Sequence, residues 1–261
     1  AFAIVDRPEL AISPQYLLVE DSLLTLQALA RHHRRTFTFP VVGLTGSNGK
    51  TTTKELIATV LTKKYRTYAT RGNLNNHIGV PLTILAIDPT QYEMAVIEMG
   101  ANHQQEIALL SSIAQPTHGL ITNIGKAHLE GFGGIEGVKK GKGELYDYLS
   151  KKKRVVFVNV QDDTLMDMLT RRNAFKEIVR YRSDNAPANP QLLAESPTVS
   201  YQSDNGQRIN THLTGAYNFD NICAAMAIGV HFGVPEDDIH EAIAAYQPDN
   251  NRSQLIQKGT N

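Results

Sequence analysis

The 261-residue sequence has the composition of an ordinary globular protein, since 41% of its residues are hydrophobic and 20% are charged. Lysine and arginine together number 26, as do aspartate and glutamate, so the overall charge favours neither a nucleic acid nor an anionic membrane as partner. No apolar run approaches the roughly 20 residues of a membrane span and no signal peptide is visible, so we expect no membrane insertion. The single cysteine, Cys223, excludes an internal disulfide and suits a reducing cytoplasm.

Short apolar segments alternate with amphipathic segments over most of the chain. We expect strands at 1–6, 16–21, 41–45, 65–70, 94–99, 118–124 and 154–160. We expect helices at 22–30, with Ser22 as the N-cap, and at 51–61, 80–85, 104–113, 136–149 and from 163 onward. Strands that alternate with helices predict parallel pairing through helical crossovers, and therefore an α/β fold.

The pattern changes in the last third of the chain. Residues 198–213 form two alternating runs on either side of an Asn-Gly pair, which predicts a β-hairpin. A loop is expected at 184–190, and two helices are expected at 218–232 and 235–246. The predicted fold is therefore a mostly parallel sheet of the phosphate-loop type, flanked by helices, with a small antiparallel hairpin region.

The segment "LTGSNGKTTTKE" (44–55) follows an apolar strand and opens a helix. Gly46 and Gly49 allow backbone N–H groups to turn toward an anion, and the helix N-terminus adds partial positive charge. Lys50 can reach the outer phosphates of a nucleotide, and Thr51 can bind Mg²⁺. The generic pattern requires glycine at position 44, where this chain has leucine, so a glycine-rich turn is the simpler alternative. The context favours phosphate binding, which leaves kinases, GTPases, ATPases and ligases open.

Three later segments carry further candidate residues. Glu98 ends an apolar strand, where a ligand crevice is expected, and its carboxylate could hold Mg²⁺ or make only a local hydrogen bond. His128 lies among glycines after another strand, and a lone histidine is more often structural than a metal ligand. Lys142 lies in "KKGKGELYDYL" (139–149), which taken alone is typical of a solvated helix face.

Taken together, the motifs resemble those of the Mur ligases of peptidoglycan synthesis. The segments that carry the resemblance are "TGSNGKTT", "RGNLNNHIGVPLTIL", "VIEMGANH", "TNIGKAHLEGFG", "KGELYDYL", "LTGAYNFDN" and "NNRSQ". They occur in the family's order from about residue 17 to residue 252. The family's loop is T-G-x-N-G-K-T, which 45–51 fit, so the missing glycine is a family trait. "GNLNNHIGVPLTIL" (72–85) most resembles the member that adds D-Ala-D-Ala. Gln105 departs from the family pattern, which commonly has glycine there.

The resemblance implies roles for individual residues. ATP and its phosphates would be held by Thr45, Gly46, Ser47, Asn48, Gly49, Lys50, Thr51, Thr52, Asn218, Asn221 and Arg252. Two Mg²⁺ ions would be bound by Thr51, Glu98, His128 and Lys142, the last as a carbamate, which turns its cation into a carboxylate. The muramoyl-peptide would contact Asn73, Asn75 and Asn76. The implied catalytic residues are Lys50, Glu98, His128 and Lys142.

The resemblance also implies an activity. The expected reaction joins D-Ala-D-Ala to UDP-N-acetylmuramoyl-tripeptide (UDP-MurNAc-tripeptide) at the expense of ATP, through an acyl phosphate. We expect a cytoplasmic monomer with small-molecule substrates and no nucleic-acid partner. Residues 1–38 resemble the end of a uridine-nucleotide-binding domain, 39–250 the central ATP-binding domain, and 251–261 the start of a linker to a C-terminal domain. We therefore expect these residues alone to bind ATP without full ligase activity.

Other functions are compatible with part of the pattern. A sister ligase that adds a single amino acid, or a folylpolyglutamate synthase, would share the loop, Glu98 and the lysine. A non-catalytic nucleotide-binding module would not need Lys142 and two metal sites. A simple kinase would require a hydroxyl acceptor and gives no reason for the lysine of "KGE".

Overall fold

The computed structural model describes residues 2–126, 129–186 and 188–248. Its centre is a six-stranded sheet with the order β4-β5-β3-β6-β7-β8, in which all neighbours are parallel. The strands of this sheet are β3 (Val41–Thr45), β4 (Thr67–Ala69), β5 (Met94–Glu98), β6 (His118–Ile121), β7 (Val155–Asn159) and β8 (Glu177–Tyr181). The predicted α/β class is confirmed, although β8 was not predicted.

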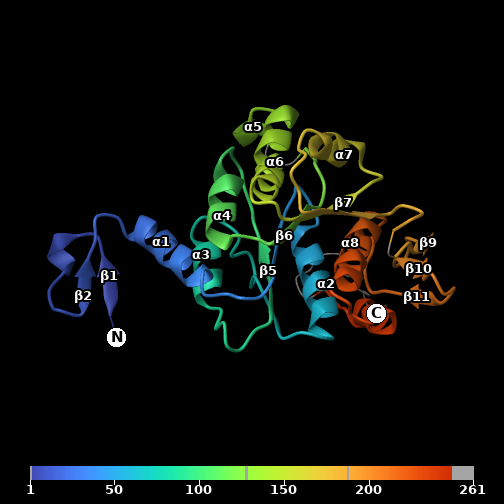
Figure 1. Cartoon of the computed structure of the whole chain (residues 1–261), viewed down its shortest axis with the longest axis horizontal. Coiled ribbons are helices and arrows are strands. Elements are labelled where there is room, and N and C mark those ends of the chain that lie inside the picture. Colours follow the sequence, from blue (N-terminus) through green and yellow to red (C-terminus); the bar gives the residue numbers. More distant parts are fainter. Residues whose placement is uncertain (1, 127–128, 187, 249–261) are drawn as a thin grey trace, which may run out of the picture.

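Helices cover both faces of the sheet (Figure 1). They are α1 (Ser22–Arg34), α2 (Lys50–Thr62), α3 (Gly79–Leu85), α4 (Glu106–Ala114), α5 (Leu129–Phe132), α6 (Ile135–Lys151), α7 (Asp163–Thr170), α8 (Tyr217–His231) and α9 (Glu236–Ala245). Alternate residues of each strand point to opposite faces. Val96 accordingly packs in the core with α2, α8 and α9, whereas Ile97 packs with α1, α3, α4, α6 and α7. Both faces are buried, which is why the strands read as continuous apolar runs.

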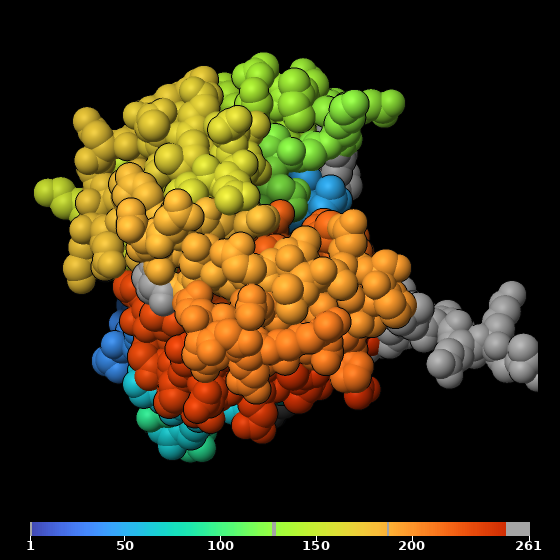
Figure 2. Space-filling view, turned by 90° about the vertical axis from the view of Figure 1, so that its right-hand side faces the viewer, coloured from blue at the N-terminus to red at the C-terminus, as the bar shows by residue number. Residues whose placement is uncertain are grey.

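A second, antiparallel sheet lies against the C-terminal helices. It has the order β11-β10-β9, built from β9 (Gln191–Ala194), β10 (Ser200–Gln202) and β11 (Arg208–Asn210). The β10–β11 hairpin is the predicted one, and β9 was not predicted. Figure 2 shows this region in orange beside the helices in red. Tyr201 Oη and His240 Nδ1 lie 2.9 Å apart and join β10 to α9.

The N-terminal strands β1 (Ala3–Val5) and β2 (Tyr16–Leu18) form a separate parallel pair around the short 3-10 helix η1 (Pro8–Leu10). In Figure 1 this pair lies at the left, beyond α1. The expected cap of α1 was wrong by one residue. Asp21 Oδ1 accepts the backbone N–H of Leu24 at 2.8 Å, while the Ser22 hydroxyl donates to Asp6. Aspartate is as good an N-cap as serine, so the sequence alone did not separate the two.

His118 makes the fold sensitive to acid. Its ring packs against those of His231 and Phe232, and burial, followed by the charge of His231, lowers the pKa of His118 to about 3. In the unfolded chain His118 binds a proton near pH 6.5, whereas in the folded chain it does so only near pH 3. The free energy of unfolding should therefore fall as pH falls from about 6.5 toward 3. We expect His118→Phe to retain about 2 kcal/mol more of its neutral-pH stability at about pH 4.5 than the wild type does.

This expectation is tested by urea unfolding at about pH 7 and about pH 4.5. His32→Phe, which changes an exposed histidine on α1, is the matched control and should follow the wild type. Equal losses of stability in the wild type and His118→Phe would contradict the assignment.

Candidate functional site

The glycine-rich loop joins β3, a central strand, to the N-terminus of α2. Gly49 precedes α2 with φ +76°, and a Cβ there would lie 2.7 Å from Asn221 Oδ1. Lys50 opens the helix, and its Nζ donates to the carbonyls of Gly46 at 2.8 Å and Ser47 at 3.0 Å. The loop thus folds around its own lysine, with the helix N-terminus and its partial positive charge directed at the same place.

A segment that follows β6 clamps this loop. Asn123 accepts the backbone N–H of Ser47 through its carbonyl and that of Asn48 through Oδ1, both at 3.0 Å. The Thr122 hydroxyl donates to the Asn48 carbonyl at 2.6 Å, and Gly125 N–H donates to Ser47 Oγ at 2.8 Å. In this segment only His128 was predicted to be a site residue. Thr122 and Asn123 could have been predicted as site residues because they follow the carboxyl end of a strand. That strand, β6, is a neighbour of β3.

Gly46 is where the clamp approaches most closely. Its φ is +151°, and an added Cβ would lie 2.0 Å from Thr122 Oγ1. We expect Gly46→Ala to weaken nucleotide binding at least about tenfold, because either the loop or the Thr122–Asn48 hydrogen bond must move. Gly72→Ala is the matched control, since Gly72 also has positive φ (+54°) but nothing within 4 Å of the new methyl group. Calorimetric titration with ADP would refute the expectation if both variants bound alike.

Glu98 ends β5, beside β3, and is 1% exposed. Its Oε1 accepts hydrogen bonds from Asn75 Nδ2 at 2.8 Å and from the Thr51 hydroxyl at 3.3 Å. Its Oε2 is buried and has no hydrogen-bond partner among the described residues. A buried carboxylate oxygen without a partner, next to a threonine hydroxyl, fits a divalent cation with oxygen ligands.

Lys142 of α6 is equally buried, being 2% exposed. Its Nζ donates to the Ala101 carbonyl at 2.9 Å and lies 5.1 Å from the ring centroid of Phe132. Burial, and after it the charge of Lys50, lowers the pKa of the Lys142 amine to about 8. The amine is therefore neutral much more often at physiological pH than that of a surface lysine. A neutral amine is the form that reacts with an electrophile.

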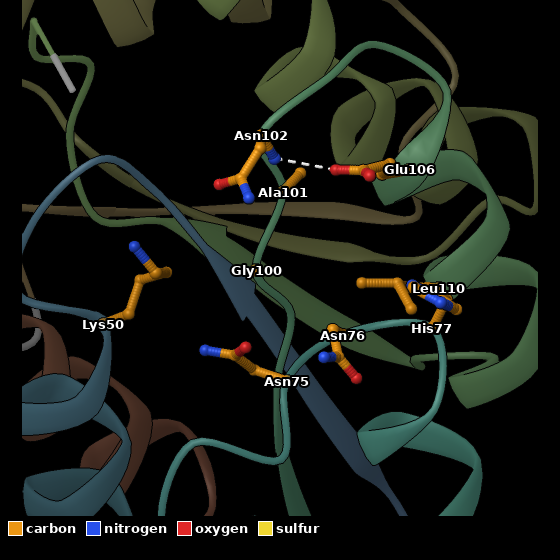
Figure 3. Close-up of a pocket in the computed structure, with 9 residues that line it drawn as sticks. All are labelled: Lys50, Asn75, Asn76, His77, Gly100, Ala101, Asn102, Glu106 and Leu110. Atoms are coloured by element: carbon orange, nitrogen blue, oxygen red, sulfur yellow. Dashed lines mark hydrogen bonds between the residues drawn. The ribbon is translucent and has the colours of Figure 1, made fainter. Parts of the chain in front are cut away.

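The loop between β5 and α4 is held on both sides by carboxylates. Glu106 accepts the backbone N–H of Asn102 at 2.7 Å, as the dashed line in Figure 3 marks. Glu144, two residues after Lys142 on α6, accepts the N–H groups of Gln105 at 2.5 Å and Ala108 at 2.9 Å. Gln105, at the position noted for departing from glycine, adopts φ +71°. These bonds fix the wall of a cavity.

Two cavities meet at these residues. One of about 500 Å³ is lined by Ser47, Asn48, Gly49, Lys50, Thr51, Thr52, Asn73, Asn75, Glu98 and Tyr217. The other, of about 350 Å³, is lined by Lys50, Asn75, Asn76, His77, Gly100, Ala101, Asn102, Glu106 and Leu110 (Figure 3). Lys50 and Asn75 line both cavities. The two cavities are therefore adjacent.

Most of the predicted site residues come together here, but some do not line either cavity. Asn218 and Asn221 are buried: Asn221 Nδ2 donates to Asn218 Oδ1 at 2.9 Å, and Thr53 donates to Asn221 Oδ1 at 3.0 Å. Asn221 thereby ties α8 to α2 behind the loop, whereas Asn218 Nδ2 donates to the Thr214 carbonyl at 2.7 Å. The exposed ring of Tyr217, which was not predicted, lines the larger cavity instead. Thr45 is buried at the end of β3.

Two of the predicted residues, His128 and Arg252, lie outside the described residues. Among the residues that are described, no three His, Cys, Asp or Glu side chains cluster as a metal site would require. A cation at Glu98 would therefore complete its shell with the Thr51 hydroxyl, ligand oxygens and water, as Mg²⁺ commonly does. Within the same described part of the chain, no helix has the length and apolar character needed to cross a membrane.

The chain is similar in sequence to curated ligases from several bacteria. The UDP-N-acetylmuramoyl-tripeptide--D-alanyl-D-alanine ligase of Bacillus subtilis is 36% identical over 253 residues, covering 92% of this chain and 52% of the relative. The ligase of the same name from Escherichia coli is 36% identical over 247 residues, covering 92% and 54%. The chain spans about half the length of these curated relatives.

Solved structures agree with the sequence comparison. A crystal structure of MurF from Acinetobacter baumannii has a TM-score of 0.83 at 35% identity and covers 98% of this chain and 56% of that one. MurF from Thermotoga maritima, solved in complex with ADP, has a TM-score of 0.78 at 29% identity and covers 94% and 57%. Residues 44–229 match the family model of the Mur ligase middle domain. These residues make up most of the sequence, and the chain therefore belongs to the Mur ligase family.

Proposed function

We propose that this chain is the ATP-binding part of a ligase that joins D-Ala-D-Ala to the tripeptide of UDP-MurNAc-tripeptide. The observation that carries the proposal is the wall formed by Lys50 and Asn75, shared by two cavities. The larger cavity is lined by the glycine-rich loop and would hold ATP, and the smaller one would hold the carboxylate that receives the γ-phosphoryl group. The choice of substrates is supported by the two relatives at 36% identity, whose names state these substrates.

The reaction follows from the chemistry of a carboxylate, which is a poor electrophile. Its oxygen would attack the γ-phosphorus of ATP, so that a new P–O bond forms while the bond to ADP breaks. The amine of D-Ala-D-Ala would then attack the acyl carbon, and phosphate leaves as the amine loses a proton. The chain's part is to position both groups and to place Lys50 against the charge that develops on the phosphoryl oxygens.

Two Mg²⁺ ions would neutralise phosphate charge when they are bound. We propose that Thr51 and Glu98 hold one of them, supported by the partnerless Glu98 Oε2. His128, and Lys142 as a carbamate, would hold the other. The neutral Lys142 amine would add its nitrogen to the carbon of CO₂ and release a proton, leaving a carboxylate-like group where the ammonium was. The lowered pKa of Lys142 supports this step.

We further propose that 39–250 form the ATP-binding unit, that 1–38 belong to a preceding uridine-nucleotide-binding domain, and that 251–261 lead into a following domain. The separate β1–β2 pair, which lies beyond α1, supports a unit that precedes the central one (Figure 1). Helix α1 nevertheless packs on the central unit, where Arg34 Nε donates to the Ala114 carbonyl at 2.7 Å. Because ATP and UDP-linked substrates belong to the cytoplasm, we place the activity there.

The test is phosphate release by the full-length gene product that carries these residues, supplied with ATP, Mg²⁺ and UDP-MurNAc-tripeptide. Parallel reactions contain D-Ala-D-Ala, single amino acids or no amine. We expect release that depends on the dipeptide. Release that depends on a single amino acid would move the protein to a sister ligase, and no release with any amine would support a nucleotide-binding module instead.

A further inference from the structure

A second cleft lies at the amino ends of the central strands, whereas the phosphate loop lies at their carboxyl ends. One cavity of about 300 Å³ is lined by Arg34, Arg35, Phe37, Thr38, Phe39, Gln115, Thr117 and Arg154. A neighbouring cavity of about 240 Å³ shares four of these residues (Thr38, Phe39, Thr117 and Arg154) and adds His118 and Lys176, among others. The lining comes from the last turn of α1 and from residues at the amino ends of β3, β6, β7 and β8. The phosphate loop follows the carboxyl end of β3, roughly 15 Å away along a five-residue strand.

The cleft carries four cationic side chains and no carboxylate. Arg34, Arg35, Arg154 and Lys176 line one or both cavities, and no aspartate or glutamate does. In the described part of the chain, none of the four lies within 4.0 Å of a carboxylate oxygen as an ion pair. The chain as a whole is electrically balanced, so this concentration of positive charge is local.

Arg34 is held in a fixed orientation. Its guanidinium is buried and donates from Nε to the Ala114 carbonyl at 2.7 Å and from Nη2 to the Gln115 carbonyl at 2.8 Å. The Phe37 ring lies 5.2 Å below it. Both hydrogen bonds go to neutral carbonyls, so they orient the guanidinium without neutralising its charge. A pre-oriented arginine loses little entropy when it binds an anion.

The cations of the cleft also repel one another. The charge of Arg154 acts, after burial, to lower the pKa of Arg34, and both Lys176 and Arg154 contribute to lowering the pKa of His118. Arg154 is the one cation that lines both cavities, and it therefore lies between the others. Unneutralised repulsion of this kind is relieved when an anion enters the cleft.

We propose that this cleft binds a small soluble anion of the diphosphate class, at a site separate from the nucleotide loop. Planar guanidinium groups match phosphate oxygens two at a time, and two adjoining cavities with cations at both ends suit a ligand with two charged groups. The cavities are concave and small, which favours a free diphosphate over the headgroups of a flat membrane. The exposed Thr38 hydroxyl adds a further donor at the centre of the cleft.

The probe is pyrophosphate, titrated calorimetrically into the chain with Lys50→Ala, which weakens binding at the nucleotide loop. The wild-type chain saturated with ADP and Mg²⁺ serves as a second background if Lys50→Ala does not fold. We expect one equivalent to bind, with affinity reduced at least about tenfold by Arg154→Gln, as for loss of a charge-assisted hydrogen bond. Lys152→Gln is the matched control, since Lys152 is an exposed cation two residues away that lines neither cavity.

The outcomes decide the proposal. Binding that Arg154→Gln weakens and Lys152→Gln leaves unchanged supports it. No binding of pyrophosphate, or an equal loss in the two variants, overturns it, because the effect would then be one of general charge. Sedimentation with phosphatidylglycerol vesicles without any binding of pyrophosphate overturns it as well, and would assign the cations to a membrane surface.

Discussion

In the full-length ligase proposed above, Lys142→Arg is expected to lower turnover at least about a hundredfold while the fold stays intact, because arginine keeps the positive charge but stays protonated and does not take up CO₂. The wild-type amine is buried against the Ala101 carbonyl and the Phe132 ring. Ala101 and Lys50 both line the smaller cavity. A permanent cation at this place would repel Mg²⁺, whereas a carbamate would attract it. Phosphate release at saturating substrates measures the effect, and circular dichroism checks the fold.

Lys139→Arg is the matched control for this substitution. Lys139 lies one turn earlier on α6, pairs with Glu136 at 2.7 Å and lines neither cavity of the site, so its turnover should be that of the wild type. A second arm removes dissolved CO₂: the wild type should lose activity and regain it with bicarbonate, while Lys142→Arg should respond to neither change. Near-normal turnover of Lys142→Arg would contradict the carbamate assignment.

The sequence was sufficient to predict the class of fold and the position of the glycine-rich loop between a strand and a helix. Buried parallel strands carry continuous apolar runs, and the helices between them carry amphipathic patterns, so both were recognisable locally. The rule that ligand sites lie at the carboxyl ends of parallel strands also located Glu98. The order of the strands in the sheet could not be predicted in this way. That β5 and β6 lie on either side of β3 depends on contacts distant in sequence.

Strand order is also why the clamp on the loop was missed. Thr122 and Asn123 contact Ser47 and Asn48 only because β6 is the neighbour of β3, and no local pattern in the sequence carries that information. The strand β8 was missed because charged residues, Glu177 and Arg180, interrupt its short apolar run, as is common in a strand at the edge of a sheet.

The role of Asn221 shows a related limit of sequence reasoning. Its contact with a nucleotide stays a prediction, and the structure adds a contact that was not predicted: its amide lies against Gly49 and Thr53, in the packing of α8 on α2. A motif indicates that a residue matters to a site, but the side chain can serve the site by holding the loop in place.

In the full-length ligase proposed above, Glu98→Gln is expected to lower turnover by about two orders of magnitude or more, which is the scale of losing one group that stabilises developing charge in an active site. Glutamine keeps the size of the side chain and can still accept the hydrogen bonds from Asn75 and Thr51. It loses the negative charge at the position of Oε2, which has no partner within the described chain. The substitution therefore tests the charge of Glu98 separately from its packing.

Stability separates the two roles that Glu98 could have. In metal-free buffer the change exchanges a buried partnerless carboxylate oxygen for a buried partnerless amide, so the free energy of unfolding should stay within about 1 kcal/mol of the wild type. With ADP and Mg²⁺ the wild type should gain thermal stability that the variant does not, because only a bound ligand adds to the stability of the folded state. Glu93→Gln, which removes the exposed carboxylate paired with Arg66 just before β5, should gain as much as the wild type. A marked loss of stability without metal, with Mg²⁺-dependent ADP binding retained, would show that the Glu98 carboxylate serves the fold rather than a cation.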